Sequence, residues 1–165
     1  MTTNELHEAR IYEVLDTVKD PEIDTVSIID LGMIERVQVD EGNVRIEVLP
    51  TFSGCPALTI IQQNIEKAII QLEDVNHVDV VFINSPAWTS DRVTAKGHEG
   101  LKQFGIAPPP KFLNEDGSWH VDCPYCGSTY VTIENIFGPT ACRSILYCKS
   151  CKNPFEAMKL ISTEM

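Results

Sequence analysis

Apolar residues recur at helical spacing in three parts of the chain. Residues 4–18 and residues 58–72 carry isoleucine, leucine and valine at every third or fourth position, with charged or polar residues between them. This pattern predicts two amphipathic helices. The first should end before Asp20-Pro21, because the residue before a proline avoids helical backbone. A shorter helix is expected from Thr94 or Ala95 to Phe104, followed by Gly105 as its C-terminal stop.

Elsewhere, apolar and polar residues alternate. Residues 34–40 and 43–49 alternate on either side of Glu41-Gly42, which predicts a β-hairpin with one buried face. Residues 77–84 alternate in the same way and predict a third strand. The resulting order of helices and strands indicates a small α+β domain in which helices pack on one sheet.

The pattern breaks down in residues 105–120, which contain three consecutive prolines and then Asn-Glu-Asp-Gly. This composition is typical of a semi-rigid spacer followed by a turn. We therefore expect an α+β domain in residues 1–107, a linker in residues 108–119 and a separate β-rich domain in residues 120–165.

Composition and charge narrow the classes of function. The chain has 165 residues, 43% of them apolar, and a net charge of −11. Residues 1–119 hold 20 acidic against 9 basic side chains, whereas residues 120–165 hold 4 of each. Such an acidic surface repels phosphate groups, so nucleic acids and anionic membranes are poor partners. The acidity serves either solubility alone or the attraction of a basic partner.

The cellular location follows from two further features. No apolar run approaches the ~18 residues that span a bilayer, and the sequence MTTNELHEAR lacks the order of a secretory signal. We expect a cytoplasmic protein. In that reducing compartment the six cysteines are more often metal ligands or reactive thiols than disulfides.

Four of these cysteines form two Cys-x-x-Cys pairs separated by 21 residues: Cys123, Cys126, Cys148 and Cys151. Two such pairs around a β-rich stretch are typical of a zinc ribbon. An iron–sulfur cluster or a redox dithiol is the alternative. Gly127 frees the backbone to turn toward the sulfurs after the first pair, and Asn153 is expected to act similarly after the second.

The predicted ribbon has strands at residues 130–133, 144–147 and 155–160. A domain of this size buries too little apolar surface to fold alone, so the metal is expected to be structural. Four thiolates leave no open coordination position for catalysis. Cys142 is a fifth cysteine in this domain, expected as a small buried residue. The alternative role for Cys142 is an auxiliary thiol near the metal.

The sixth cysteine lies in residues 50–58, PTFSGCPAL. Pro56 suits the first helical position, which would make Cys55 the N-cap of the second helix. Amide groups at a helix start would lower the pKa of the thiol, and Gly54 would let another group approach it. A cysteine at a strand–helix junction is equally often a packing residue, so these features leave both roles open.

Acidic residues offer further candidate ligands. Asp20 and Glu22 form one group, and Asp30 precedes Leu-Gly just before the first strand. Carboxylates together with a thiolate can hold iron, although capping of turns is their commoner role. His7, His77, His98 and His120 lack paired ligand spacing, and only His120 lies near the ribbon.

Several motifs resemble the small iron–sulfur cluster assembly superfamily, which includes SufT-like proteins and the eukaryotic cytosolic iron–sulfur targeting factors. They are Asp20-Pro-Glu22, residues 27–34 (SIIDLGMI), residues 50–57 (PTFSGCPA) and residues 86–89 (PAWT). Residues 137–142 (FGPTAC) and Pro154-Phe155 within the ribbon extend the likeness. The whole chain resembles the PaaD family, also called PaaJ, which are small accessory subunits of the bacterial phenylacetyl-CoA epoxidase system.

This resemblance implies an assembly-type α+β fold followed by a zinc ribbon, and a place in aerobic phenylacetate degradation. The subunit would not catalyse the oxygenation. It would help to deliver iron or an iron–sulfur cluster to the oxygenase or its reductase. By motif, Cys55 would match the family's cysteine, Asp20 and Glu22 its acidic pair, and Asp30 its acidic residue before Leu-Gly. The four ribbon cysteines would hold zinc.

Three functional hypotheses follow. In the first, the protein is a non-catalytic maturation factor in which two protomers supply Cys55 together, since one cysteine is too few for a stable cluster. In the second, it is a structural scaffold of the oxygenase complex. The third, a ring-hydroxylating enzyme, is set aside because the chain lacks the Glu and Glu-x-x-His set of a di-iron bundle.

Overall fold

The computed structural model describes residues 3–52, 54–110 and 113–161, with side chains from residue 7 onward. It divides the chain into two compact units, Met1–Trp88 and Thr89–Met165. Residues 1–88 contain 16 of the 24 acidic residues and 5 of the 13 basic ones. The first unit therefore carries the whole net charge of −11, and the second is neutral.

The first unit is built on a three-stranded sheet in the order β3 (Ile34–Asp40), β4 (Asn43–Val48) and β5 (His77–Phe82). Strands β3 and β4 form the predicted hairpin, and β5 pairs parallel to β4. Glu41 and Gly42 at the turn have φ of 46° and 84°. Two consecutive residues with positive φ match the right-handed twist of the strands, which explains the Glu-Gly pair.

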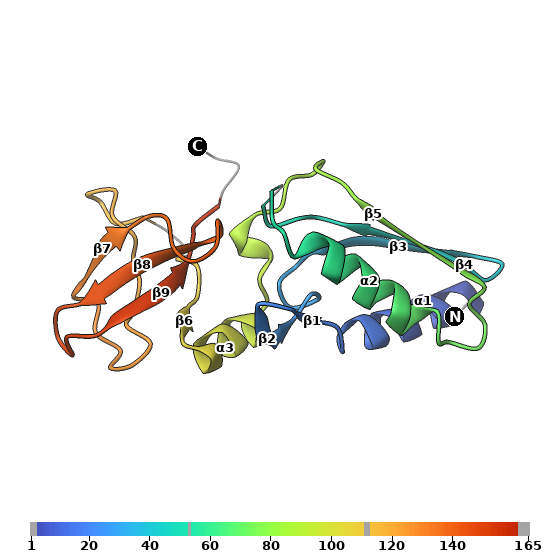
Figure 1. Cartoon of the computed structure of the whole chain (residues 1–165), viewed down its shortest axis with the longest axis horizontal. Coiled ribbons are helices and arrows are strands. Elements are labelled where there is room, and N and C mark those ends of the chain that lie inside the picture. The colour runs from blue at the N-terminus through green and yellow to red at the C-terminus, as the bar shows by residue number, and fades with distance from the viewer. Residues whose placement is uncertain (1–2, 53, 111–112, 162–165) are drawn as a thin grey trace. The chain divides into compact units, whose positions relative to one another are not determined.

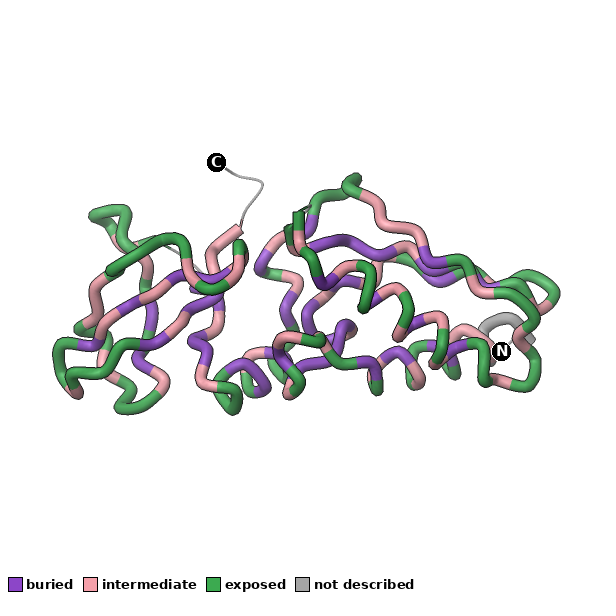
Figure 2. The backbone as a smooth tube through the Cα atoms, viewed as in Figure 1, coloured by how far each residue is buried: buried purple, intermediate pink, exposed green. Residues whose placement is uncertain are grey.

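Two helices pack against this sheet (Figure 1). Helix α1 (Thr3–Leu15) contacts β3, helix α2 (Leu58–Ile69) contacts β5, and the helices contact each other. The apolar stripe of α2 places Ile61, Ile65 and Ile69 in the core. Buried and exposed positions alternate along β4 (Figure 2). The α+β fold with helices packed on a sheet is thus confirmed.

A short hairpin of β1 (Lys19–Asp20) and β2 (Ile23–Ser27) was not predicted. Its first strand has two residues, too few to show alternation. The hairpin matters for function because Asp20 ends its first strand and Glu22 lies in its turn.

The second unit contains a 3₁₀ turn η1 (Ser90–Arg92), helix α3 (Ala95–Phe104) and a four-stranded sheet. The sheet order is β6 (Ile106–Ala107), β9 (Pro154–Met158), β8 (Arg143–Cys148) and β7 (Val131–Asn135). Helix α3 begins and ends as predicted: Thr94 accepts the N–H of Gly97, and Gly105 follows in the left-handed conformation. The three predicted ribbon strands are present, with ends shifted by one or two residues.

The division of the chain differs from the boundary expected at residue 107. Strand β6 pairs parallel to β9, so Ile106 and Ala107 belong to the ribbon sheet. Pro109 and Pro110 are buried, and Leu113 forms a bridge with Trp119. The proline segment is therefore part of a folded unit that includes α3. Its composition resembled a linker because proline stiffens packed and free segments alike.

Candidate metal-binding sites

The four ribbon cysteines converge on one point. Their Sγ atoms all lie within 4.8 Å of one another. Cys123 Sγ lies 3.7 Å from Cys151 Sγ, and Cys126 Sγ lies 3.6 Å from Cys148 Sγ. Zinc bound by four sulfurs at ~2.3 Å requires sulfur–sulfur distances of about 3.8 Å. The sulfurs are thus already spaced for a tetrahedral ion, and their chemistry fits zinc.

Each Cys-x-x-Cys pair lies on a tight backbone turn. In the first, the N–H of Gly127 donates to the carbonyl of Cys123 at 2.8 Å, and Gly127 has a φ of 75°. In the second, the N–H of Lys152 donates to the carbonyl of Cys148 at 2.9 Å, and Lys152 has a φ of 64°. The prediction that Asn153 plays this part is wrong. In both Cys-x-x-Cys pairs, the residue with left-handed backbone conformation directly follows the second cysteine of the pair.

The sulfur cluster is part of the core of the second unit. Cys123 and Cys148 are buried together with Leu146, Phe155 and Ala157. The N–H of Cys151 points at Cys148 Sγ at 3.5 Å and is the main cause that lowers the pKa of Cys148 to about 6. The sulfurs share hydrogen bonds, and the pKa of Cys126 is raised to about 11, so the group of four sulfurs favours one thiolate, at Cys148.

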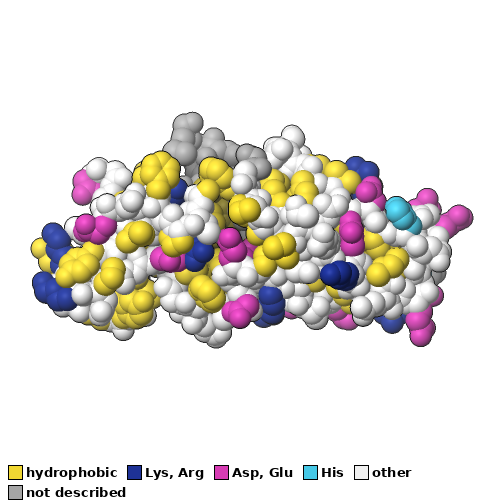
Figure 3. Space-filling view, in the orientation of Figure 1, with side chains coloured by type: hydrophobic (Ala, Val, Ile, Leu, Met, Phe, Trp, Pro, Cys, Tyr) yellow, Lys and Arg dark blue, Asp and Glu magenta, His cyan; other side chains and the backbone are white. Residues whose placement is uncertain are grey.

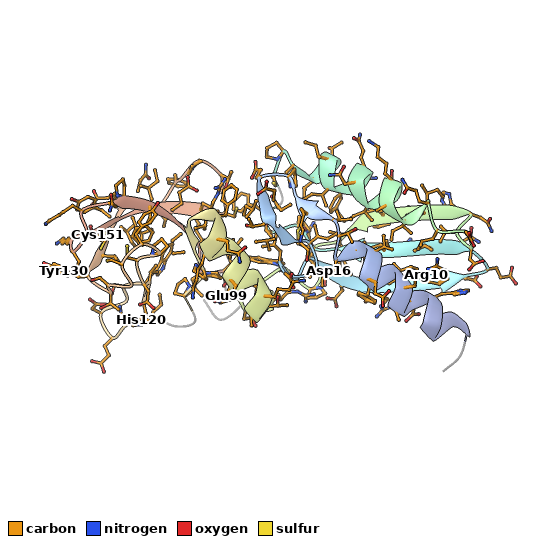
Figure 4. All side chains as sticks on the ribbon, turned by 90° about the horizontal axis from the view of Figure 1, so that it is seen from below. Arg10, Asp16, Glu99, His120, Tyr130 and Cys151 are labelled. Carbon is orange, nitrogen blue, oxygen red and sulfur yellow. The ribbon has the colours of Figure 1, made fainter. Side chains whose placement is uncertain are left out.

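Cys142 and His120 lie outside this group of four sulfurs. Cys142 is half-buried, and its Sγ lies 3.3 Å from Oγ1 of Thr140. His120 is exposed on the segment that precedes the first pair (Figure 4). Four sulfurs complete a tetrahedral site without either residue.

Cys55 is a half-buried thiol between β4 and α2. The prediction that it caps α2 is wrong, because the helix begins at Leu58 and Ala57 takes the capping position. Cys55 belongs to the preceding turn, where its carbonyl accepts the N–H of Leu58 at 3.4 Å. Gly54 is exposed, and a Cβ built there would meet nothing within 4 Å.

The pKa of Cys55 is raised, which corrects the expectation of a lowered value. Partial burial is the main cause, and the negative charges of Glu22 and Asp20 add to it. The N–H groups of Ala57 and Leu58 lower the pKa but do not outweigh these effects. The thiol is therefore protonated at neutral pH, which does not suit a nucleophile. Carboxylates that repel a thiolate would instead stabilise a cation bound beside it.

Tertiary structure thus brings Asp20 and Glu22 near enough to Cys55 for their charges to act on it. Asp20 also has a structural role, because its Oδ1 accepts the N–H of Glu22 at 2.8 Å and that of Ile23 at 3.1 Å. Asp30 is buried, and its Oδ2 accepts the hydroxyl of Ser27 at 3.1 Å. Asp30 is not among the charges that shift the pKa of Cys55.

Two residues of this region were missed by sequence reasoning. The buried hydroxyl of Ser27 lies 2.8 Å from Oδ1 of Asp16, which directly follows α1 (Figure 4). Asp16 and Asp30 are therefore both tied to Ser27, although 14 positions separate them along the chain. Trp88 is buried nearby, and its indole N–H donates to the carbonyl of Leu31 at 2.8 Å.

The raised pKa leads to a prediction about reactivity. We expect Glu22→Gln to increase the rate of Cys55 alkylation by iodoacetamide at pH 8 a few-fold, because removal of the charge lowers the pKa and increases the thiolate fraction. Peptide mass spectrometry of the zinc-loaded protein measures the rate, with Cys142 as internal reference. Asp24→Asn is the matched control, since Asp24 is an exposed carboxylate without a part in the shift. Equal rates in wild type and Glu22→Gln would contradict the prediction.

Two protein families match the two parts of the chain. Residues 8–80 match the family described as "Iron-sulfur cluster assembly protein". Residues 107–159 match the family described as "PaaD zinc beta ribbon domain". Among the described residues, no helix is both long and apolar enough to cross a membrane.

Individual relatives agree with these families. The chain is 38% identical to a putative subunit of the 1,2-phenylacetyl-CoA epoxidase of Escherichia coli, over 95% of this chain and 94% of that protein. It is 35% identical to "Fe-S protein maturation auxiliary factor YitW" of Bacillus subtilis, over 51% of this chain and 82% of that protein.

The chain is also similar to the solved structure of a DUF59 domain from Bacillus anthracis, with a TM-score of 0.57 and 29% identity. The match covers 60% of this chain and 94% of the solved one. The resemblance inferred from the sequence motifs is therefore confirmed. The chain belongs to the PaaD family, with an iron–sulfur cluster assembly domain followed by a PaaD-type zinc β-ribbon.

Proposed function

We propose that this protein is a maturation factor of a phenylacetyl-CoA epoxidase system, acting in the cytoplasm in aerobic phenylacetate degradation. It assists the delivery of iron or an iron–sulfur cluster to the oxygenase or, in particular, to its reductase. Its relatives support an accessory role, since they include an epoxidase subunit and auxiliary factors of iron–sulfur protein maturation. The protein itself does not catalyse the oxygenation.

The main support for this proposal is the electrostatic environment of the Cys55 thiol. The thiol is partly accessible and lies within reach of the charges of Glu22 and Asp20. A neutral thiol beside two carboxylates is poorly suited to nucleophilic attack and well suited to an iron ion, which binds thiolate and carboxylate together. Cys55, Asp20 and Glu22 would hold the iron or cluster as cargo, with Asp30 ordering the neighbouring turn through Ser27. Two protomers would each contribute one Cys55 to a shared cluster.

The ribbon would hold the client protein. Four of its large apolar side chains lie exposed along β7 and its flanking turns: Tyr130, Ile133, Ile136 and Phe137. Phe137 is the most exposed of them, at 72%. Figure 3 shows hydrophobic side chains with basic ones beside them at the surface of this unit. Exposed apolar surface of this kind is typical of protein interaction sites.

Anaerobic reconstitution with iron and sulfide tests the cluster site. We expect wild type to develop cluster absorbance and to bind iron in addition to one zinc per chain, and Cys55→Ala to bind zinc alone. Cys142→Ala is the matched control, because Cys142 is also a half-buried thiol outside the zinc site. Equal absorbance in wild type and Cys55→Ala would reject the assignment of Cys55.

The exposed apolar residues of β7 also favour a second candidate, a scaffold that stabilises the epoxidase complex through the ribbon alone. In that case Cys55 is a packing residue. The two candidates predict different results when the thiol is removed and the complex still assembles. A maturation factor then leaves its client without a cluster, whereas a scaffold leaves the client unaffected.

A further inference from the structure

A second feature of the ribbon unit is a groove whose lining includes none of the four sulfurs. The groove, of about 430 Å³, opens between the end of α3 and the sheet strands β8 and β9. Its walls include Phe104, Ile145, Pro154 and Tyr125, and its polar groups come from Arg143 and Glu156.

The groove occupies the face of the sheet that does not pack on the metal site. Leu146 on β8 and Phe155 and Ala157 on β9 are buried in the core with the cysteines. Ile145 and Glu156 alternate with these residues and pair directly across the two strands, so their side chains lie on the opposite face. The exposed aromatic rings of Phe104 and Tyr125 border this face.

The polar part of the groove is an ion pair between a buried Arg143 and a half-buried Glu156. Arg143 is only 7% exposed. Its Nη1 donates to Oε2 of Glu156 at 2.6 Å, and its Nε donates to Oγ1 of Thr140 at 3.0 Å. A guanidinium has five N–H groups, so three have no acceptor among the described residues. The second carboxylate oxygen of Glu156 likewise has no donor there, so both partners retain hydrogen-bonding capacity for an occupant of the groove.

This chemistry selects a neutral polar group rather than a charged one. The ion pair has no net charge, and it offers donors on Arg143 beside an acceptor on Glu156. An amide satisfies both at once, because its carbonyl accepts from Arg143 and its N–H donates to Glu156. A carboxylate would accept from Arg143 but meet the charge of Glu156. The surrounding aromatic, proline and isoleucine walls fit an apolar side chain.

We propose that this groove binds a peptide segment of a partner protein, with an apolar side chain against Phe104 and Tyr125 and the adjoining amide on Arg143 and Glu156. The site is independent of the cluster-binding role proposed for Cys55, because it lies wholly within the second unit. It gives the ribbon a means to recognise uncharged, apolar sequence in its client.

N-acetyl-phenylalaninamide is a minimal probe for this site, and N-acetyl-phenylalanine is the same molecule with a carboxylate in place of the amide. In titrations of the full zinc-loaded chain followed by NMR, we expect the amide to shift signals of Arg143, Ile145 and Glu156. It should bind roughly threefold to tenfold more tightly than the carboxylate, the size expected for one net hydrogen bond. N-acetylglycinamide, which lacks the ring, should bind more weakly than the phenylalanine amide.

Two variants make the test specific. Phe104→Ala removes one wall and should weaken binding of the phenylalanine amide. Leu113→Ala, which truncates an exposed apolar side chain of the same unit outside the groove, should leave it unchanged. Glu156→Gln removes the opposing charge and should turn the preference toward the carboxylate. The proposal is overturned if neither probe shifts groove signals, if wild type prefers the carboxylate, or if Phe104→Ala alters only self-association in sedimentation experiments.

Discussion

Replacement of Cys148 by serine is expected to unfold the second unit while the first remains folded. Cys148 is fully buried and supplies one of four sulfurs spaced for a tetrahedral ion. Structural zinc contributes about 10–16 kcal/mol to the folding of small zinc domains. Loss of one ligand removes much of this folding free energy. The effect on the second unit is direct, because two of the four cysteines, Cys123 and Cys148, are part of its core.

The two units can be followed separately in this experiment. Zinc content measured by mass spectrometry should fall from one ion per chain to a small fraction. NMR signals of Trp119, which packs on the ribbon core, should lose their dispersion, whereas those of Trp88 in the first unit should persist. Cys142→Ser is the control that keeps zinc and both folds. Full zinc occupancy with dispersed Trp119 signals in Cys148→Ser would contradict the prediction, because three cysteines would then suffice to bind zinc and fold the unit.

Cys55→Ala should abolish maturation of the client without unfolding either unit. The side chain is small and half-buried, so its truncation removes little packing. If Cys55 holds the cargo, reductase produced with this variant and the other epoxidase subunits should lack iron–sulfur absorbance. Epoxidation of phenylacetyl-CoA should then fall at least about tenfold, since the client lacks the cluster that this protein is proposed to deliver. Chemical reconstitution of the purified reductase should restore the activity.

This outcome separates the two functional hypotheses. A maturation factor without its thiol still co-purifies with the epoxidase subunits through the ribbon, but its client lacks a cluster. A scaffold retains both assembly and activity in Cys55→Ala. Cys142→Ala serves as the matched control, with normal activity expected under either hypothesis.

Local sequence pattern was sufficient for much of the fold. The hairpin of β3 and β4 followed from alternation around Glu41-Gly42, because a half-buried strand and a turn with positive φ depend on neighbouring residues alone. Helix α2 followed from its isoleucine stripe for the same reason. The convergence of four sulfurs followed from the spacing of two Cys-x-x-Cys pairs, which holds each pair of sulfurs on its own turn.

Contacts between distant segments were decided only in three dimensions. Strand β6 has two residues and no pattern of its own, and it joins the ribbon because β9 offers a free edge. The hairpin of β1 and β2 carries Asp20 and Glu22 to Cys55, more than 30 positions further along the chain. Partial burial of the thiol, together with these two charges, raises the pKa of Cys55, whereas its neighbours in sequence lower it. Backbone conformation is a local property, but the electrostatic environment of a side chain is the sum over everything that folding brings near it.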